Sequence, residues 1–181
     1  MTEIEVKLRW NGDAASALNF LETHGHRASG PRLLESDQLF DLPSGELRRT
    51  RQVLRLRITG GKATVTYKGA DTPGAYKSRE EIEFDVSDPG AFEAVLARLG
   101  YQRSFRYEKF RTKFAKGEGV VTLDETPIGI FMELEGPAYW IDATARGLGY
   151  AHEQYLTASY SALYAEFRQA HPEAPRDMTF A

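Results

Sequence analysis

Residues 3–10 read EIEVKLRW, with charged and apolar residues alternating along the whole stretch. Side chains of one kind therefore recur at every second position, which is the period of a β-strand. One face of this strand carries only charged side chains, namely Glu3, Glu5, Lys7 and Arg9. For a single strand, the ordinary interpretation is that the charged face meets water and the apolar face meets a core.

The same alternation recurs in later segments, which indicates a protein rich in strands. We predict eight strands, at residues 3–10, 32–42, 54–58, 63–68, 76–85, 102–114, 119–125 and 128–136. Helices are predicted at residues 13–24, 88–99, 139–147 and 156–170, with a short one between residues 43 and 51.

Charged residues occupy one face of nearly every predicted strand, so solvation alone explains the whole set poorly. The set comprises Glu3, Glu5, Lys7, Arg55, Arg57, Lys68, Lys77, Arg79, Glu81, Glu83, Lys109, Arg111, Lys113, Asp124, Glu133 and Glu135. If the helices cover the aliphatic faces, the charged faces must point at one another, and the sheet must curl into a wide barrel with a polar lumen. Mixed charge in a confined lumen needs compensation, either by mutual pairing or by bound ions.

The composition is that of an ordinary globular protein and excludes several kinds of site. The 181 residues fit one domain, and the absence of cysteine excludes disulfides, thiol nucleophiles and zinc–thiolate sites. No apolar run approaches the roughly 18 residues that span a bilayer, and the N-terminus lacks the apolar core of a signal peptide. A net charge of −3 argues against a duplex nucleic-acid binder. We therefore expect a soluble, cytoplasmic protein without a membrane or nucleic-acid partner.

The carboxylates come in pairs that suit a hard metal ion. Three E-x-E pairs occur, Glu3/Glu5, Glu81/Glu83 and Glu133/Glu135. Residues i and i+2 of a strand share a face roughly 6.5–7 Å apart, so one pair can hold a cation. Oxygen ligands without cysteine indicate Mg²⁺ or Mn²⁺. Salt bridges across the sheet are the alternative, and they would suffice to explain a single pair.

The basic residues form the other half of the lumen. Arg55, Arg57, Lys68, Arg79, Lys109 and Arg111 would surround an anion. Arginine contacts phosphate oxygens in a bidentate manner, and lysine acts as a point charge. A metal beside a ring of cations is typical of phosphoryl or nucleotidyl transfer.

Other candidate sites receive no role. His24, His26, His152 and His171 show no ligand spacing, and we expect them to be exposed or to cap helices. Tyr160, Tyr164 and Phe167 have helical spacing and are expected in the core.

A series of motifs resembles a known family. Glu3-Ile4-Glu5-Val6-Lys7 is similar to the E-x-E-x-K signature of the CYTH superfamily, the triphosphate tunnel metalloenzymes. Further matches follow in order: 37–41 (DQLFD), 54–57 (LRLR), 66–69 (TYKG), 77–83 (KSREEIE), 107–111 (YEKFR), 123–125 (LDE) and 133–136 (ELEG). The spacing most resembles the bacterial branch named after class IV adenylyl cyclases, which includes thiamine-triphosphatase-like proteins. Ser159-Tyr160 resembles a short C-terminal motif of this branch, and we give it no role.

The resemblance implies an α+β fold, a closed eight-stranded antiparallel β-barrel with helices packed outside and a C-terminal helix at one end. It implies that metal is bound by Glu3, Glu5, Glu133 and Glu135, with Glu81, Glu83 and Asp124 as further candidates. It implies that the triphosphate is held by Lys7, Arg55, Arg57, Lys68, Arg79, Lys109 and Arg111. Proteins of this kind often dimerise through exposed sheet faces, so a homodimer stays open.

Three functions follow from this set of residues. The first is a metal-dependent hydrolase of inorganic triphosphate, thiamine triphosphate or a nucleoside triphosphate, with Glu5, Lys7 and Glu133 in the reaction. The second is an adenylyl cyclase, in which the ribose 3′-hydroxyl attacks the α-phosphorus of ATP and pyrophosphate leaves. The third is a non-catalytic binder of nucleotide or polyphosphate. We favour hydrolysis, because a cyclase also needs a base pocket and a ribose site that the motifs do not reveal.

We predict one tunnel domain over residues 1–171. The tail at residues 172–181 contains two prolines, which favours a loosely ordered segment.

Overall fold

The computed structural model describes the chain except residues 1, 72–73, 75 and 181, together with the side chains of Thr2 and Glu3. The predicted metal ligand Glu3 thus lies, as a side chain, outside the described residues. No helix of the described part is long and apolar enough to cross a bilayer.

Eight strands and five α-helices make up the described chain. The strands are β1 (Thr2–Trp10), β2 (Leu33–Asp41), β3 (Val53–Thr59), β4 (Lys62–Lys68), β5 (Lys77–Val86), β6 (Gln102–Lys116), β7 (Gly119–Thr126) and β8 (Gly129–Glu135). The helices are α1 (Ala14–Thr23), α2 (Glu46–Arg49), α3 (Pro89–Arg98), α4 (Ala138–Gly147) and α5 (Tyr160–Ala170), with a 3₁₀ turn at His152–Gln154.

The strands close into one antiparallel barrel in the order β1-β5-β4-β3-β2-β6-β7-β8. Closure is made by β1, which pairs with β5 through its first half and with β8 from Glu5 onward. The predicted closed eight-stranded barrel is therefore confirmed.

The register places opposite charges on neighbouring strands beside each other. Lys7 lies opposite Glu133, Lys68 opposite Glu81, and Arg111 opposite Asp124. Cross-strand pairs of opposite charge stabilise a sheet, and a slip of one residue would turn each of these side chains to the other face. The charged interior thus helps to select the register.

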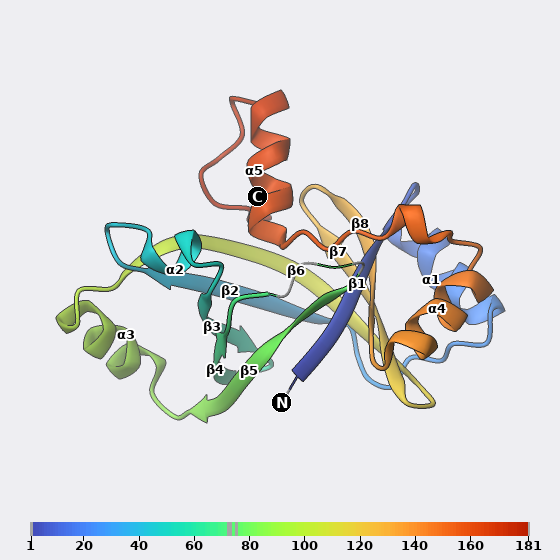
Figure 1. The fold of residues 1–181 in the computed structure, drawn as a ribbon, viewed down its shortest axis with the longest axis horizontal. Coiled ribbons are helices and arrows are strands. Elements are labelled where there is room, and N and C mark those ends of the chain that lie inside the picture. The colour runs from blue at the N-terminus through green and yellow to red at the C-terminus, as the bar shows by residue number, and fades with distance from the viewer. Residues whose placement is uncertain (1, 72–73, 75, 181) are drawn as a thin grey trace.

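Helices cover the aliphatic outer faces of the barrel. One cluster joins Val6, Leu8 and Leu134 of the sheet to Leu21 of α1 and Ile141 of α4, all fully buried. Another joins Leu56 and Val65 to Leu96 of α3. In Figure 1, α1 and α4 lie beside β1, β7 and β8, α3 lies at the opposite end, and α5 stands alone above the barrel.

The predicted helix at residues 156–170 begins later than expected, at Tyr160. Leu156 pairs instead with Lys7 of β1 through two backbone hydrogen bonds of 2.9 Å each, which holds this segment extended. Ser159 then caps α5, since its side chain accepts a hydrogen bond from the Ala162 amide. The start of α5 is therefore tied to β1.

The last residues of the chain return to β6. The Met178 amide donates to the Arg106 carbonyl at 3.0 Å, the Glu108 amide donates to the Met178 carbonyl at 2.8 Å, and Met178 is fully buried. Tyr164 of α5 donates to the Pro175 carbonyl at 2.8 Å. The two prolines of this segment do not prevent its packing against α5 and β6.

A close approach at the start of β7 gives a test of the packing. A Cβ added at Gly119 would overlap the Trp140 ring and lie 2.7 Å from the Glu135 carbonyl oxygen. We expect Gly119→Ala to lower the free energy of unfolding by about 1–3 kcal/mol, as overpacking does. Urea unfolding followed by circular dichroism measures this change.

The matched control is Gly147→Ala, because Gly147 ends α4 and a Cβ added there would have no heavy atom within 4 Å. It should leave stability unchanged or raise it by less than about 1 kcal/mol. Equal stability of the two variants would contradict this account of Gly119.

Candidate functional site

The barrel encloses a cavity of about 300 Å³ whose walls are mostly charged. Its basic lining residues are Lys7, Arg55, Arg57, Lys68, Lys77, Arg79, Lys109, Arg111 and Lys113, and its acidic ones are Glu5, Glu81, Glu83, Glu133 and Glu135. The charged faces of the strands therefore do point at one another. Of the predicted site residues with described side chains, Asp124 alone is absent from this lining, because it lies beneath the basic residues.

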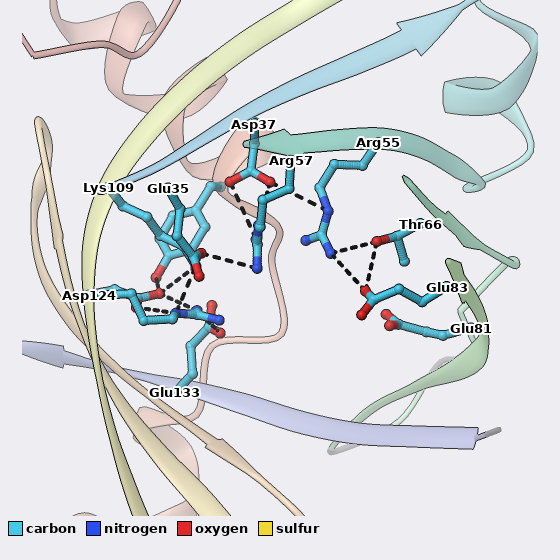
Figure 2. A network of polar contacts seen from close by, with 12 residues as sticks. Glu35, Asp37, Arg55, Arg57, Thr66, Glu81, Glu83, Lys109, Asp124 and Glu133 are labelled. Carbon is cyan, nitrogen blue, oxygen red and sulfur yellow. Dashed lines mark hydrogen bonds and ion pairs between the residues drawn. The ribbon is translucent and has the colours of Figure 1, made fainter. Parts of the chain in front are cut away.

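Asp37 of β2 holds two of the arginines. Its carboxylate accepts a hydrogen bond from Arg57 Nε at 2.8 Å, and Arg55 Nε lies 3.4 Å away. Asp37 is fully buried, and Figure 2 shows both guanidinium groups converging on it. Glu35 adds an ion pair to Arg57 at 3.1 Å. The two arginines are therefore oriented before any ligand binds, which lowers the entropic cost of binding.

Asp124 of β7 orients two neighbouring cations, Lys109 and Arg111, in the same way. Its carboxylate accepts from Lys109 Nζ at 2.7 Å and from Arg111 Nε at 2.6 Å. The Tyr160 hydroxyl of α5 also donates to it, at 2.7 Å. With three donors and no exposure, Asp124 acts in this structure as a counter-ion to Lys109 and Arg111.

Lys7 of β1 lies between two glutamates. Its Nζ is 3.6 Å from Glu5 Oε1 and 3.4 Å from Glu133 Oε1. Lys77 donates to the same oxygen of Glu5 at 2.6 Å. These two carboxylates, from β1 and β8, form the acidic centre of the lumen.

Three further predicted residues, Lys68, Glu81 and Glu83, line the β3–β5 side. Lys68 is ion-paired with Glu81. Glu83 accepts a hydrogen bond from the Thr66 hydroxyl at 2.9 Å, and Thr66 in turn accepts one from Arg55 at 2.9 Å. Figure 2 shows Glu83 on the far side of Arg55 from Asp37, so Arg55 has an acid on either side.

The acidic centre is ionised at neutral pH. Burial by itself would raise the pKa of Glu5, but the ammonium groups of Lys7 and Lys77 outweigh it and lower that pKa. Burial likewise opposes ionisation of Glu133, and Arg111 and Lys109 nevertheless hold its pKa well below the usual range. Both groups are thus available as anionic oxygen ligands.

The pKa values of the two lysines of the acidic centre, Lys7 and Lys77, are shifted in opposite directions. Burial disfavours the ammonium of Lys7, but Glu5 and Glu133 outweigh this and raise its pKa. At Lys77, burial and the nearby Lys7 charge lower the pKa to about 8, despite the contact with Glu5. Lys7 therefore remains a cation and a donor, whereas Lys77 loses its proton more easily.

The lumen is close to neutral without a ligand. Three buried acids, Glu35, Asp37 and Asp124, lie behind the five acidic lining residues, so eight acidic side chains face nine basic ones among the described residues. A bound triphosphate would add several negative charges. A divalent cation bound with it would restore the balance.

The donor set fits such a cation. Among the described residues, no three carboxylate, histidine or cysteine side chains converge on one point. Mg²⁺ needs no such cage, because it is usually held by one or two carboxylates together with water and substrate phosphates. Glu5 and Glu133 provide two ionised carboxylates whose mutual repulsion a cation would relieve.

Several residues of the lumen escaped the sequence prediction. Lys77 was predicted on the charged face but given no role, and Asp37 was seen only as part of a motif. Tyr160 was expected in the core; its ring is buried, yet its hydroxyl reaches Asp124 and its face lies 5.3 Å from Lys7 Nζ and 4.8 Å from Lys109 Nζ. Its Ser159-Tyr160 motif was the available signal.

Two of the four histidines cap helices as expected, since His24 follows α1 and His171 follows α5. The prediction was wrong for His26, which is 2% exposed. Burial lowers its pKa to about 4, with Lys116 and His24 adding to the effect, so it is neutral. It lies outside the lumen lining.

Comparison with known proteins identifies this architecture. The sequence profile of the CYTH domain matches residues 1–139, which include all eight strands. The chain belongs to the CYTH domain family. The family predicted from the motif series is thus confirmed.

Individual relatives support the assignment to this family. A Methanocaldococcus jannaschii protein named "Putative adenylate cyclase" is 29% identical over 136 residues, which are 75% of this chain and 77% of that protein. A Pyrococcus horikoshii structure has a TM-score of 0.80 at 24% identity, covering 92% of this chain and 99% of the other. A Hippeastrum protein, named "Putative adenylyl cyclase" and described as having a dominant triphosphatase activity, has a TM-score of 0.63 at 16% identity, covering 93% and 95%. The two structures are similar in fold.

The role of Asp124 can be tested without any metal. In EDTA, we expect Asp124→Asn to lower the free energy of unfolding by about 3 kcal/mol, because Lys109 and Arg111 lose their buried counter-ion. Chemical denaturation measures the change.

Asp85→Asn is the control, since Asp85 is an exposed carboxylate of β5 that accepts from Thr64. This variant should change stability by less than about 0.5 kcal/mol. An Asp124 variant as stable in EDTA as the control would show that the carboxylate is not needed as a counter-ion.

Proposed function

We propose that this CYTH protein is a divalent-metal-dependent hydrolase of triphosphate-containing substrates, bound in the barrel lumen. One observation carries the proposal: a cavity inside the closed barrel in which nine basic lining residues adjoin the ionised carboxylates of Glu5 and Glu133. Such a surface binds an anion with several phosphates together with a hard cation. A cytoplasmic location and a homodimer stay predictions.

The basic residues would bind the phosphate chain. Arg55 and Arg57 are held by Asp37, and Lys109 and Arg111 by Asp124, so their donors are in place before the substrate arrives. Preorganised donors in a cavity with little water stabilise charge that builds on phosphate oxygens in the transition state. Lys7, Lys68 and Arg79 complete the proposed phosphate-binding set.

The acidic residues would hold Mg²⁺ or Mn²⁺. Glu5 and Glu133 are the proposed ligands, with Glu3, Glu81, Glu83, Glu135 and Asp124 as the further members of the predicted set. A bound divalent ion would neutralise phosphate charge and orient the chain. Asp124 is the weakest of these candidates, because its oxygens already accept from Lys109, Arg111 and Tyr160.

In the proposed reaction, a water oxygen bonds to the terminal phosphorus and the bond from that phosphorus to its bridging oxygen breaks. The products are inorganic phosphate and the shortened diphosphate, and the proton lost by the attacking water passes to solvent. Lys7 keeps its proton at neutral pH, so it acts as a donor toward the leaving oxygen and not as the base that activates water.

Adenylyl cyclisation is the second candidate, and the M. jannaschii relative supports it by its name. The Hippeastrum protein combines a cyclase name with a dominant triphosphatase activity, which supports hydrolysis in the same fold. Hydrolysis also requires less of the binding site than cyclisation does, because the site need not hold a ribose with its 3′-hydroxyl against the α-phosphorus. Non-catalytic binding is the third candidate.

Product analysis separates these candidates. The protein is incubated with ATP, tripolyphosphate and thiamine triphosphate, each with Mg²⁺ or Mn²⁺, and the products are identified by ion chromatography. We expect inorganic phosphate and the corresponding diphosphate or pyrophosphate. Cyclic AMP with pyrophosphate would establish cyclisation, and binding without turnover of any of the three would leave a binder.

Two further variants test the acidic centre. Glu5→Gln and Glu133→Gln each keep the shape of the side chain but remove a proposed metal ligand. Metal-dependent turnover should fall by about 100-fold or more, because loss of an outer-shell partner of a metal ligand alone costs about 10–100-fold. Both proteins should stay folded by circular dichroism.

Glu22→Gln, on the exposed face of α1, is the matched control and should retain full activity. Wild-type turnover in both folded Gln variants would show that the metal ligands lie elsewhere.

A further inference from the structure

The carboxylate of Asp142 joins two segments that lie far apart in the sequence. Asp142 belongs to α4 and accepts one hydrogen bond on each oxygen, from the Tyr76 hydroxyl at 2.7 Å and from the Tyr155 hydroxyl at 3.0 Å. We call these three residues the α4 clamp. None of them lines the lumen, so any effect of the clamp on the site must pass through neighbouring residues.

One tyrosine of the clamp directly precedes the start of β5. Tyr76 is followed by Lys77, the first residue of that strand, which pairs with Glu5 of β1. The Lys77 side chain is buried, and its Nζ donates to Glu5 at 2.6 Å. The clamp therefore holds the chain immediately before the residue that enters the acidic centre.

The other tyrosine directly precedes a segment that pairs with β1. Tyr155 is followed by Leu156, which pairs with Lys7 through two backbone hydrogen bonds of 2.9 Å each. Lys7 also lies opposite β8, so Leu156 must lie on the other side of β1, which is the side that β5 occupies up to Glu5. In Figure 1 this segment, between α4 and α5, runs past β1. The clamp thus holds two segments that follow one another along the same edge of β1.

The clamp is packed as well as hydrogen-bonded. Both tyrosine rings pack against the apolar cluster that β1 shares with α1 and α4. The His152 ring lies 4.6 Å from the Tyr155 ring and 5.8 Å from the Tyr76 ring, in the second case edge to face. Hydrogen bonds from Tyr76 and Tyr155 lower the pKa of Asp142, so its carboxylate is ionised at neutral pH. A hydrogen bond to an ionised acceptor is about twice as strong as a neutral one, which favours a fixed geometry.

We propose that Asp142 is a positioning residue for the reaction in the lumen. Through Tyr76 it sets the position of Lys77 beside the acidic centre. Through Tyr155 and the chain that follows, it sets the position of Lys7, the proposed donor toward the leaving oxygen. A displacement of about 1 Å that originates far from the reacting atoms can cost on the order of 100-fold in rate. The inference rests on the proposed function, because it assumes that the lumen binds a triphosphate.

The first test needs neither metal nor substrate. In EDTA, we expect Asp142→Ala to speed the amide hydrogen exchange of Lys7 and Leu156 by about tenfold, because the segment after Tyr155 loses its tie to α4. The amide of Leu56 in β3, which belongs to a different apolar cluster, should exchange within about twofold of its wild-type rate. Exchange is followed by two-dimensional NMR. Unchanged exchange at Lys7 and Leu156, or an equal gain at Leu56, would overturn the proposal.

Tyr139→Phe is the matched control. Tyr139 also belongs to α4, and its hydroxyl donates to Glu118 in the turn between β6 and β7, outside the lumen lining. The variant removes a tyrosine–carboxylate hydrogen bond of the same kind from the same helix. It should leave the exchange of Lys7 and Leu156 at the wild-type rate.

The second test asks whether the clamp acts on the lumen. The Kd of tripolyphosphate is measured by calorimetry with Mg²⁺, and turnover is measured separately on protein shown to be folded by circular dichroism. Asp142→Ala should lower turnover by about tenfold or more and raise the Kd by about fivefold. The double variant Tyr76→Phe/Tyr155→Phe should reproduce these losses, and adding Asp142→Ala to it should cost little more, since changes to one shared interaction are not additive. Tyr139→Phe should retain the wild-type values.

A lysine variant separates positioning from a role in stability alone. In the wild-type background, Tyr76→Phe should raise the Kd of tripolyphosphate by about threefold. In a Lys77→Met background, the same change should have almost no further effect, because the side chain that Tyr76 positions is gone. An equal loss in both backgrounds would show that Tyr76 does not act through Lys77 and would overturn that part of the proposal.

Exchange, binding and turnover separate this inference from the proposed function. If the wild type binds tripolyphosphate but hydrolyses no triphosphate, the proposed hydrolysis is wrong, and the exchange rates and Kd values still decide the role of Asp142. If the wild type hydrolyses tripolyphosphate and Asp142→Ala has the same Kd and turnover, the function holds and the positioning role is wrong.

Discussion

The structure depends on compensating charge that is buried inside a barrel. An ionised side chain removed from water costs several kcal/mol unless an opposite charge or a hydrogen bond replaces the solvent. Here the compensation is organised in groups: Asp37 serves two arginines, Asp124 serves a lysine and an arginine, and Glu5 serves two lysines. Several of these cations have a second acid as partner, as Lys7 and Arg111 do in Glu133, so the interior is close to neutral. An anion bound there would therefore need a cation bound with it.

The same arrangement explains why the helices lie outside. Alternation along each strand places aliphatic residues opposite the charged ones, so the outer faces must be covered. Leu21, Ile141 and Leu96 cover them from α1, α4 and α3. α5 is the exception, because its Tyr160 reaches inward and donates a hydrogen bond to Asp124.

Alternation and E-x-E spacing were enough to predict the strands, their inward faces and most of the charged lining. A period of two is a local property, so it can be read from consecutive residues. The pairing of Arg57 with Asp37 or Lys109 with Asp124 depends on strand order and register, which only the closed sheet determines. The extended segment at Leu156 and the buried His26 depend on distant neighbours in the same way. The cavity of about 850 Å³ between α2 and α5 was unpredictable because several separate segments of the chain contribute to its lining.

All eight strands are complete by Glu135, whereas the residues that tie α5 to the barrel follow much later in the chain. The sequence profile shared with other family members ends at residue 139, before Leu156, Ser159 and α5. The segment that ties α5 to the barrel is therefore separate in sequence from the strands that build it. Every charged residue of the lumen lining lies on a strand, so substitutions in the segment after residue 139 leave that set of charges unchanged.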